Sequence, residues 1–324
     1  MNYLHALVFY RTITPLHVGC GQAVGVVDLP VIRERATGYP YIPGSGIRGS
    51  LRDIFETRNR DLTDTLFGPD NNTNTEEKAS ESEDDKYAGC IAVHDARLLF
   101  YPVRSDQKVF LWITCLPVLE RFKRDLEAFD SQFPLASMGD LKEISNDRFV
   151  GPADLGAHVH LEEFRFQRAE GDDAGKLAGV MQALEPVLGL PGLAQRTVLV
   201  SAQSFYHFVN YATMLVQHNT LTSAKTVKGG MLFSVESLPP ETVCYGMIGA
   251  TSPRRDAARK KKLNRKNMLD EFRNTLIGNA PGKETVCLHL GGKESTGLGV
   301  TQLTWHENQK NSEQTTNHEA SEEN

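Results

Sequence analysis

The pattern of apolar and polar positions predicts a chain that mixes strands and helices. Residues 3–14 (YLHALVFYRTIT) are rich in β-forming residues and indicate an opening strand. Residues 26–35 return to extended character after a glycine-bearing loop. Residues 90–104 and 108–116 indicate two further strands, and residues 158–166 (HVHLEEFRF) alternate as a half-buried strand does.

Helical periodicity separates these strands. We expect a helix that begins at Ser45 as its N-cap, because apolar residues then recur at the spacing of one helix face. The expected core residues of this helix are Ile47, Leu51, Ile54 and Phe55. Further helices are expected after Pro117, near 174–188, after Ser201 and over the basic residues 254–277.

This order of elements is typical of an α+β fold. Strand, helix, two strands, helix and the alternating strand at 158–166 predict a ferredoxin-like or RRM-like βαββαβ sheet with insertions. Two more strands, at 212–218 and 241–250, are expected to pair as a hairpin and to flank residues 219–240. That excursion is too long for a tight turn, so we expect it to project from the body.

Composition limits the classes of protein that remain. The chain has 324 residues with 40% hydrophobic and 23% charged residues, which excludes a wholly disordered chain, a collagen and a long coiled coil. No apolar run approaches the roughly 20 residues of a membrane helix, and the N-terminus has no signal-peptide pattern. We therefore expect a cytoplasmic protein. Its five cysteines lack CxxC spacing, so they are expected to be reduced thiols.

Charge is unevenly distributed along the chain. The net charge is −6, of which residues 70–87 carry −5 and residues 306–324 carry −4, so the remainder is +3. Both acidic segments are polar and almost free of large apolar residues, which predicts a loop and a disordered tail. The basic run 254–266 is either a solvated helix face or a patch for a nucleic-acid backbone, and its charge favours the patch.

The segment PGSGIRGSLRD is a candidate phosphate site. Gly44 and Gly46 allow close approach of a ligand to the amides at the helix start, where an anion is favoured. Ser45, Arg48 and Arg52 share one helix face, separate from the core stripe. An ordinary capped helix with two solvated arginines explains this segment equally well.

A second glycine-rich segment, GGKESTGLG at 291–299, lies between two expected strands. It contains four glycines, a lysine and two hydroxyl residues, but it lacks the strand-to-helix context and the Lys-Ser/Thr ending of a nucleotide-binding loop. Two phosphate candidates in one chain suit a polyanion better than a mononucleotide.

Asp28 is the candidate acid. It stands between two valines and Leu29-Pro30, directly after the loop that contains His17. Asp28 is either a turn residue before the proline or a carboxylate that recruits magnesium beside bound phosphates. His17 could orient a reactant or act as a base, although a structural histidine is the more common case.

Together these segments resemble a known family. Residues 16–53 (LHVGCGQAVGVVDLPVIRERATGYPYIPGSGIRGSLRD) resemble the N-terminal signature of the RAMP superfamily, and GGKESTGLG resembles its glycine-rich loop. TVKGGMLFSVESLPPETVCYG at 226–246 is similar to the thumb hairpin of the fourth Cmr protein family, the repeated backbone subunits of type III-B CRISPR effector complexes. The resemblance implies one RAMP palm domain over 1–305, with the acidic loop inserted and a thumb at about 218–241.

The resemblance also implies function and partners. Such subunits bind guide RNA, associate with copies of themselves and other Cmr proteins in a helical filament, and cleave complementary target RNA with a divalent metal, Mg²⁺ or Mn²⁺. Asp28 matches the family's essential aspartate and His17 matches a nearby histidine, so both are expected to be catalytic, and Asp28 is expected to hold the metal. The expected RNA-binding residues are Gly44, Ser45, Gly46, Arg48, Arg52, Lys225, Lys228, Phe233, Glu236, Gly291, Gly292, Lys293 and Thr296.

Two alternatives stay open on the sequence. A purely structural RNA-binding subunit would use the same glycines and arginines without chemistry at Asp28. A repeat-processing RAMP endonuclease would act as a monomer, without metal, through a histidine base.

Overall fold

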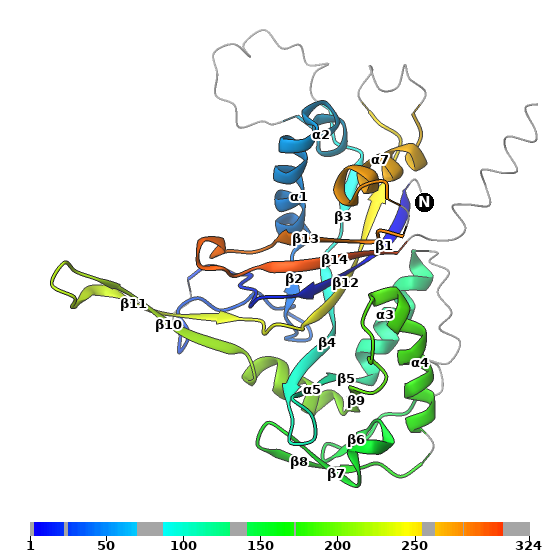
Figure 1. Ribbon diagram of the computed structural model, residues 1–324, viewed down its shortest axis with the longest axis vertical. Coiled ribbons are helices and arrows are strands. Elements are labelled where there is room, and N and C mark those ends of the chain that lie inside the picture. The colour runs from blue at the N-terminus through cyan, green and yellow to red at the C-terminus, as the bar shows by residue number, and fades with distance from the viewer. Residues whose placement is uncertain are drawn as a thin grey trace, which may run out of the picture.

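One large sheet organises the molecule. The computed structural model describes residues 3–22, 25–69, 87–129, 141–171, 173–254, 263–280 and 282–306. Within them, a 12-stranded sheet has the order β13-β14-β1-β12-β4-β5-β9-β6-β8-β7, with β2 on β4 and β3 on β12 (Figure 1). Most of the predicted acidic loop and tail, and residues 255–262 of the basic run, lie outside the described residues.

The upper half of the sheet in Figure 1 is a ferredoxin-like unit. β1 (Leu4–Thr12) lies between β14 (Val300–His306) and β12 (Val243–Ala250), and β12 pairs with β4 (Ala96–Arg104), all antiparallel. Helix α1 (Gly44–Arg58) follows β1. Helix α7 (Arg265–Ile277) follows β12. The βαββαβ prediction is therefore confirmed.

The second half of that unit differs from the prediction. Its third strand, second helix and fourth strand are β12, α7 and β14, instead of residues 108–116, the helix after Pro117 and residues 158–166. The chain between β4 and β12 is an insertion that extends the same sheet and adds the hairpin. Periodicity identifies elements, but it does not reveal which of them pair across so long an insertion.

The remaining elements complete this framework. Near the first helix are β2 (Tyr41–Ile42), α2 (Arg60–Phe67) and β3 (Ile91–Val93). The insertion contains β5 (Phe110–Thr114), α3 (Leu116–Ala128), β6 (Arg148–Val150), η4 (Ala153–Leu155), β7 (His158–Leu161), β8 (Phe164–Arg168), α4 (Asp173–Leu188), β9 (Thr197–Val200) and α5 (Ala202–Tyr211). Near the C-terminus are β13 (Thr285–His289) and η5 (Glu294–Thr296).

Four predicted boundaries are wrong. Helix α1 begins at Gly44 after Pro43, so Ser45 is inside the helix and is not its N-cap. Residues 90–104 form two strands, β3 and β4, and residues 158–166 form the β7–β8 hairpin with Glu162 at a positive φ of 50°. Residues 26–35 make only isolated bridges. Of the helix expected over 254–277, the described part is α7, which begins at Arg265 and is capped by the Asn264 side chain; residues 255–262 lie outside the described residues.

The excursion before β12 forms a two-stranded hairpin that projects from the body (Figure 1). Its strands are β10 (Met214–Leu221) and β11 (Val227–Ser237), which pair antiparallel. Projection was expected, but the predicted pairing of 212–218 with 241–250 is wrong, because β12 pairs with β1 instead. The hairpin leaves large apolar side chains exposed, among them Leu215 and Leu232.

Helices α1 and α7 pack together through aromatic rings. Ile47, Leu51 and Phe55 are buried, as the helical spacing predicts. The Phe55 ring stacks on Phe272 of α7 at 4.9 Å between centroids with an interplanar angle of 23°. This contact joins the two helices of the ferredoxin-like unit on one face of its sheet.

Two further findings concern the described residues. No helix among them has the length and apolar character needed to cross a membrane. All five cysteines are free in the structure, with Cys90, Cys115 and Cys244 buried.

Replacing Phe55 with alanine tests this packing. Phe55 is fully buried, so Phe55→Ala is expected to lower the free energy of unfolding by about 3–5 kcal/mol through loss of burial and creation of a cavity. Urea unfolding followed by circular dichroism measures the change. The exposed Thr57→Ala on the same helix is the control, and an equal effect of both substitutions would contradict the packing described.

Candidate active site

Asp28 lies in a segment that runs beside the second strand of the hairpin. Leu29 and Val235 form a parallel bridge. The Leu29 amide donates to the Ser234 carbonyl at 3.0 Å, and the Glu236 amide donates to the Leu29 carbonyl at 3.0 Å. The backbone on either side of Asp28 is thereby attached to the base of the hairpin.

One oxygen of the Asp28 carboxylate is held by the hairpin. Oδ2 accepts from both the amide and the hydroxyl of Ser234, each at 2.8 Å. These bonds lower the pKa of Asp28 because they stabilise the charged form of the carboxylate. The bond from the Ser234 amide contributes most to this effect. Among the described residues Oδ1 has no hydrogen-bond partner, so the half-buried carboxylate keeps one oxygen available to a ligand.

His17 is anchored on the same strand. Its ring is buried, and Nδ1 lies 2.6 Å from the Glu236 carbonyl oxygen. A carbonyl only accepts, so Nδ1 carries the proton of this bond, and Nε2 is the acceptor nitrogen of the neutral ring. Ser234 and Glu236 are two residues apart on β11, so the anchors of Asp28 and His17 are separated by about 7 Å along the strand.

The glycine-rich segment packs against His17. The Gly292 amide donates to the His17 carbonyl at 2.9 Å. Gly291 has a φ of 73°, and a Cβ there would lie 2.3 Å from the same carbonyl oxygen, so only glycine fits. Gly19 similarly makes room for the imidazole, because a Cβ on it would lie 2.7 Å from Nε2.

Glu236 is occupied by internal contacts. Oε1 accepts from Arg33 at 2.6 Å, and Oε2 accepts from the Val31 amide at 2.9 Å. Arg33 also donates to the Val209 carbonyl at 2.9 Å. The carboxylate of Glu236 therefore attaches residues 31–33 to the hairpin, and its expected RNA contact stays a prediction.

Lys293 joins the glycine-rich segment to an aromatic pair on the hairpin. Its Nζ lies 4.9 Å from the ring centroid of Phe233, and that ring stacks on His218 at 5.6 Å with an angle of 15°. Lys293 has a positive φ of 69°, and its carbonyl accepts from the Thr296 hydroxyl at 2.8 Å. Phe233, Gly291, Gly292 and Lys293 thus gather with His17 at the base of the hairpin.

Lys225 and Lys228 lie further out on the same hairpin. Both are exposed, and Lys225 belongs to the turn that joins the two strands. Their ammonium groups are available to a phosphate backbone, and the predicted RNA contacts stay predictions.

The start of α1, predicted as a phosphate site, bonds a carboxylate of this chain. The Gly44 amide donates to the Asp95 carboxylate at 2.7 Å, which places a negative charge where the sequence predicts a phosphate. Ser45 and Gly46 are exposed on the first turn.

Arg48 and Arg52 have internal partners. Arg48 donates to the Phe67 carbonyl and lies over that ring, and burial lowers the pKa of its guanidinium. Arg52 donates to Glu56 at 2.7 Å and to the Gly68 carbonyl at 3.0 Å. Both arginines therefore stabilise the end of α2, and RNA binding by these residues remains a prediction.

At this site Asp28 offers a divalent metal one carboxylate oxygen that has no hydrogen-bond partner among the described residues. No group of three or more His, Cys, Asp or Glu side chains in the described ranges is arranged to hold a metal. Mg²⁺ commonly takes one or two protein carboxylates and completes its shell with water and phosphate oxygens. Asp28 therefore fits a Mg²⁺ ion that is bound by its carboxylate together with phosphate oxygens and water. The described residues do not fit an ion whose ligands are all protein side chains.

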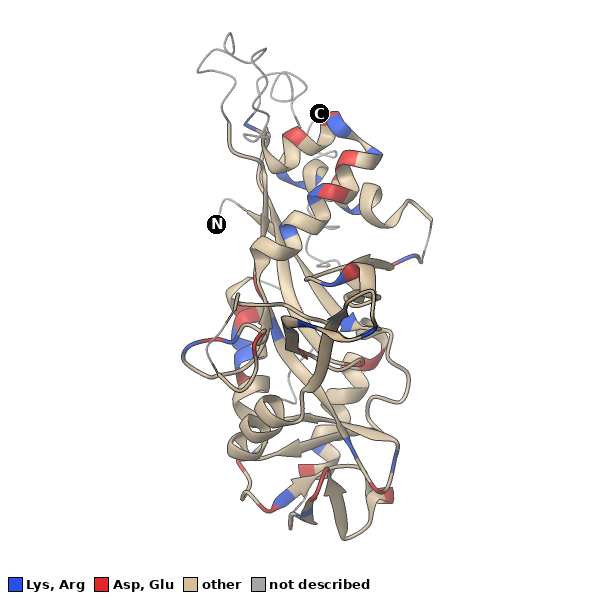
Figure 2. Ribbon diagram, turned by 90° about the vertical axis from the view of Figure 1, so that its left-hand side faces the viewer, with Lys and Arg blue, Asp and Glu red and all other residues tan. Residues whose placement is uncertain are grey.

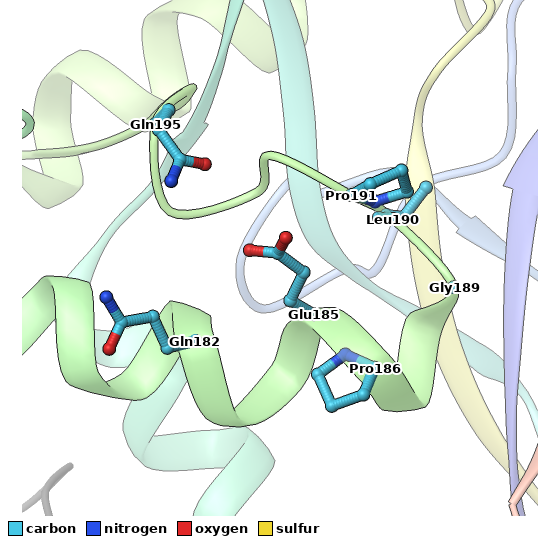
Figure 3. Close-up of a pocket in the computed structure, with 7 residues that line it drawn as sticks. All are labelled: Gln182, Glu185, Pro186, Gly189, Leu190, Pro191 and Gln195. Atoms are coloured by element: carbon cyan, nitrogen blue, oxygen red, sulfur yellow. The ribbon is translucent and has the colours of Figure 1, made fainter.

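In the described part of the chain, one further surface pocket lies apart from the predicted site residues. Seen from the side on which the hairpin projects, Lys and Arg positions are interspersed with Asp and Glu positions along the ribbon (Figure 2). A pocket of about 600 Å³ lies at the C-terminal end of α4 (Figure 3), and its Glu185 accepts from the Gly192 amide at 2.7 Å. None of the predicted site residues lines it.

Sequence reasoning missed Ser234, Arg33 and Asp95. Ser234 and Asp28 are 206 positions apart in the sequence, and Arg33 and Glu236 are 203 apart. Neither pair belongs to a local motif, so no signal in the printed sequence could have joined them.

Comparisons with known proteins show the family of this chain. The family model of the RAMP superfamily matches residues 9–302. The chain is 33% identical to the CRISPR system Cmr endoribonuclease Cmr4 of Pyrococcus furiosus over 92% of this chain and 94% of that protein.

Solved structures share the fold. The crystal structure of oligomeric Cmr4 from Pyrococcus furiosus has a TM-score of 0.65 and 26% identity, over 93% of this chain and 97% of that one. A cryo-EM structure of the type III-B Cmr-beta complex bound to cognate target RNA contains a chain with a TM-score of 0.66 and 19% identity, over 94% of this chain and 98% of that chain. From the family-model match over residues 9–302 and the 33% identity to Cmr4 over 92% of this chain, we conclude that this chain belongs to the RAMP superfamily, in the group of Cmr4 proteins.

Proposed function

We propose that this chain is the repeated backbone subunit of a type III-B CRISPR ribonucleoprotein and cleaves target RNA at Asp28. It binds guide RNA and complementary target RNA and assembles with copies of itself and with other Cmr subunits. Support comes from the full-length similarity to an endoribonuclease, Cmr4, and from the likeness to an oligomeric Cmr4 structure. The observation that carries the assignment of chemistry is the Asp28 carboxylate, held at the base of a projecting hairpin with one oxygen free.

The hairpin and the glycine-rich segment beside it suit an RNA backbone. Lys225 and Lys228 are exposed on the outer part of the hairpin, and Lys293 lies beside the Phe233 ring, so these residues supply positive charge and an aromatic ring. Phosphate contacts by lysines and stacking on aromatic rings bind RNA without reading its sequence. Selection of the target then comes from base pairing with the guide, while the protein positions the strand.

The proposed reaction is internal transfer at a phosphodiester of the target strand. The hairpin displaces a nucleotide so that its 2′-oxygen lies in line with the adjacent phosphorus. The bond from the 2′-oxygen to phosphorus forms and the bond from phosphorus to the 5′-oxygen breaks, giving a cyclic phosphate and a 5′-hydroxyl. Positioning supplies much of the rate, because the reacting groups are held in one geometry.

Asp28 and His17 are the groups of this chain that serve the reaction. The proton of the 2′-hydroxyl passes to a base, for which the free Asp28 oxygen and the His17 Nε2 are the candidates. The 5′-oxygen takes up a proton as it leaves. A divalent cation, Mg²⁺ or Mn²⁺, held by the free oxygen of Asp28 and by RNA phosphates would neutralise charge that develops on the phosphate.

Replacing Asp28 tests the assignment directly. Asp28→Ala is expected to lower target cleavage by at least ~100-fold, the range associated with loss of an acid–base group. Binding of the target should stay within a factor of about two, because lysines and guide pairing carry it. The measurement is single-turnover cleavage of a labelled complementary RNA by the complex reconstituted with guide RNA.

The matched control is Asp106→Ala, which removes an aspartate that bonds His160 in the inserted part of the chain. It should cleave like the wild type. Full cleavage by Asp28→Ala, with binding intact, would instead assign this chain a purely structural role.

Metal removal separates the proposed reaction from metal-independent processing. Addition of a chelator is expected to stop cleavage by the wild-type complex, and excess Mg²⁺ or Mn²⁺ to restore it, because the free Asp28 oxygen and the phosphates then regain their cation. Target binding is measured in the same chelator as a control. Cleavage that persists at the full rate in chelator would refute the metal requirement and favour a histidine-based mechanism.

A further inference from the structure

Ser234 on the hairpin makes three hydrogen bonds with Asp28. Its hydroxyl accepts from the Asp28 amide at 2.9 Å and donates to Oδ2 at 2.8 Å, and its own amide donates to Oδ2 at 2.8 Å. A hydroxyl has one proton and two lone pairs, so it fills both roles at once. Ser234 is 4% exposed, which protects these bonds from competition with water.

These bonds determine the orientation of the Asp28 side chain. Two donors on Oδ2 restrict rotation about both side-chain torsions, and the bond to the amide holds the backbone at the same residue. Oδ1 is consequently directed away from Ser234 and has no partner among the described residues. Without the hydroxyl, Oδ2 would keep one donor and the Asp28 amide would lose its acceptor.

Neighbouring contacts attach the chain beyond Asp28 without touching its carboxylate. Leu29 is bonded through its backbone, and Arg33 is bonded to Glu236. The segment therefore stays attached to β11 when the Ser234 hydroxyl is removed, while the carboxylate gains rotational freedom. The effect of Ser234 on Asp28 can thus be separated from the folding of the site.

We infer that Ser234 is a positioning residue for target cleavage, which couples the hairpin to the reactive oxygen of Asp28. The inference rests on the proposed function, and it adds a residue and a mechanical link that the assignment of Asp28 does not contain. Because Ser234 belongs to the same strand as Phe233, RNA that contacts the hairpin acts on the element that orients the carboxylate.

The test compares Ser234→Ala, Ser234→Thr and the control Ser237→Ala in the reconstituted complex with guide RNA. Ser237 is a buried serine on the same strand with no hydrogen bond to Asp28 among the described residues. Ser234→Ala is expected to lower the single-turnover cleavage rate about tenfold, with target affinity within a factor of about two, because positioning affects the reaction and not binding. Ser234→Thr keeps the hydroxyl and should restore the rate to within about threefold, and Ser237→Ala should match the wild type.

Hydrogen exchange at the Asp28 amide gives a readout that does not depend on cleavage. Resolved by mass spectrometry on the full chain, this exchange should be at least about fivefold faster in Ser234→Ala and close to wild type in Ser234→Thr, since the hydroxyl is the amide's acceptor. Wild-type cleavage by Ser234→Ala, while Asp28→Ala is inactive, would overturn the inference and leave the proposed function intact.

Two other outcomes also decide against the inference. Loss of target binding in both Ser234 variants would give Ser234 a structural role only. Full cleavage by Asp28→Ala would remove the proposed function itself, and with it the reaction that Ser234 is inferred to serve.

Discussion

The attachment of residues 28–33 to strand β11 is the contact on which the site depends. The segment contributes no strand of its own to the large sheet, so its conformation comes from the hairpin beside it. Backbone bonds at Leu29 set the register, and Ser234 and Glu236 then reach back from alternate positions of β11 to bond Asp28 and Arg33. The acid, the histidine and the glycine-rich segment meet because each of them contacts this one strand or its immediate neighbour.

Buried charge contributes specificity to this attachment. Glu236 and Arg33 are paired at 2.6 Å with little exposure of the glutamate. A buried ion pair adds little net stability when its geometry is satisfied, but loss of one partner leaves a costly unpaired charge. We interpret this ion pair as selecting one register of residues 28–33 against β11, the register in which Asp28 contacts Ser234.

The glycines and arginines at the start of α1 form a pattern typical of an anion site, but here they stabilise the fold. Glycines and arginines at a helix N-terminus suggest an anion site, because the amides there are unpaired. In this chain Asp95, from the link between β3 and β4, supplies the anion to Gly44. Arg48 and Arg52 turn to the carbonyls at the end of α2, which lack partners for the same reason.

Much of this protein follows from sequence alone. The buried stripe of α1, the helix capped by Ser201, the projecting excursion and the α+β class are local properties, since periodicity, capping and loop length act over a few residues. The resemblance carried by residues 16–53 and 291–299 identified the family and singled out Asp28 and His17 as candidate catalytic residues. Tertiary structure decided which strands form the ferredoxin-like unit, that β10 pairs with β11, and that Ser234 holds Asp28. The β1–β12 pairing and the contact between Asp28 and Ser234 join residues more than 200 positions apart, where burial and backbone pairing in the folded chain, and no local preference, select the partner.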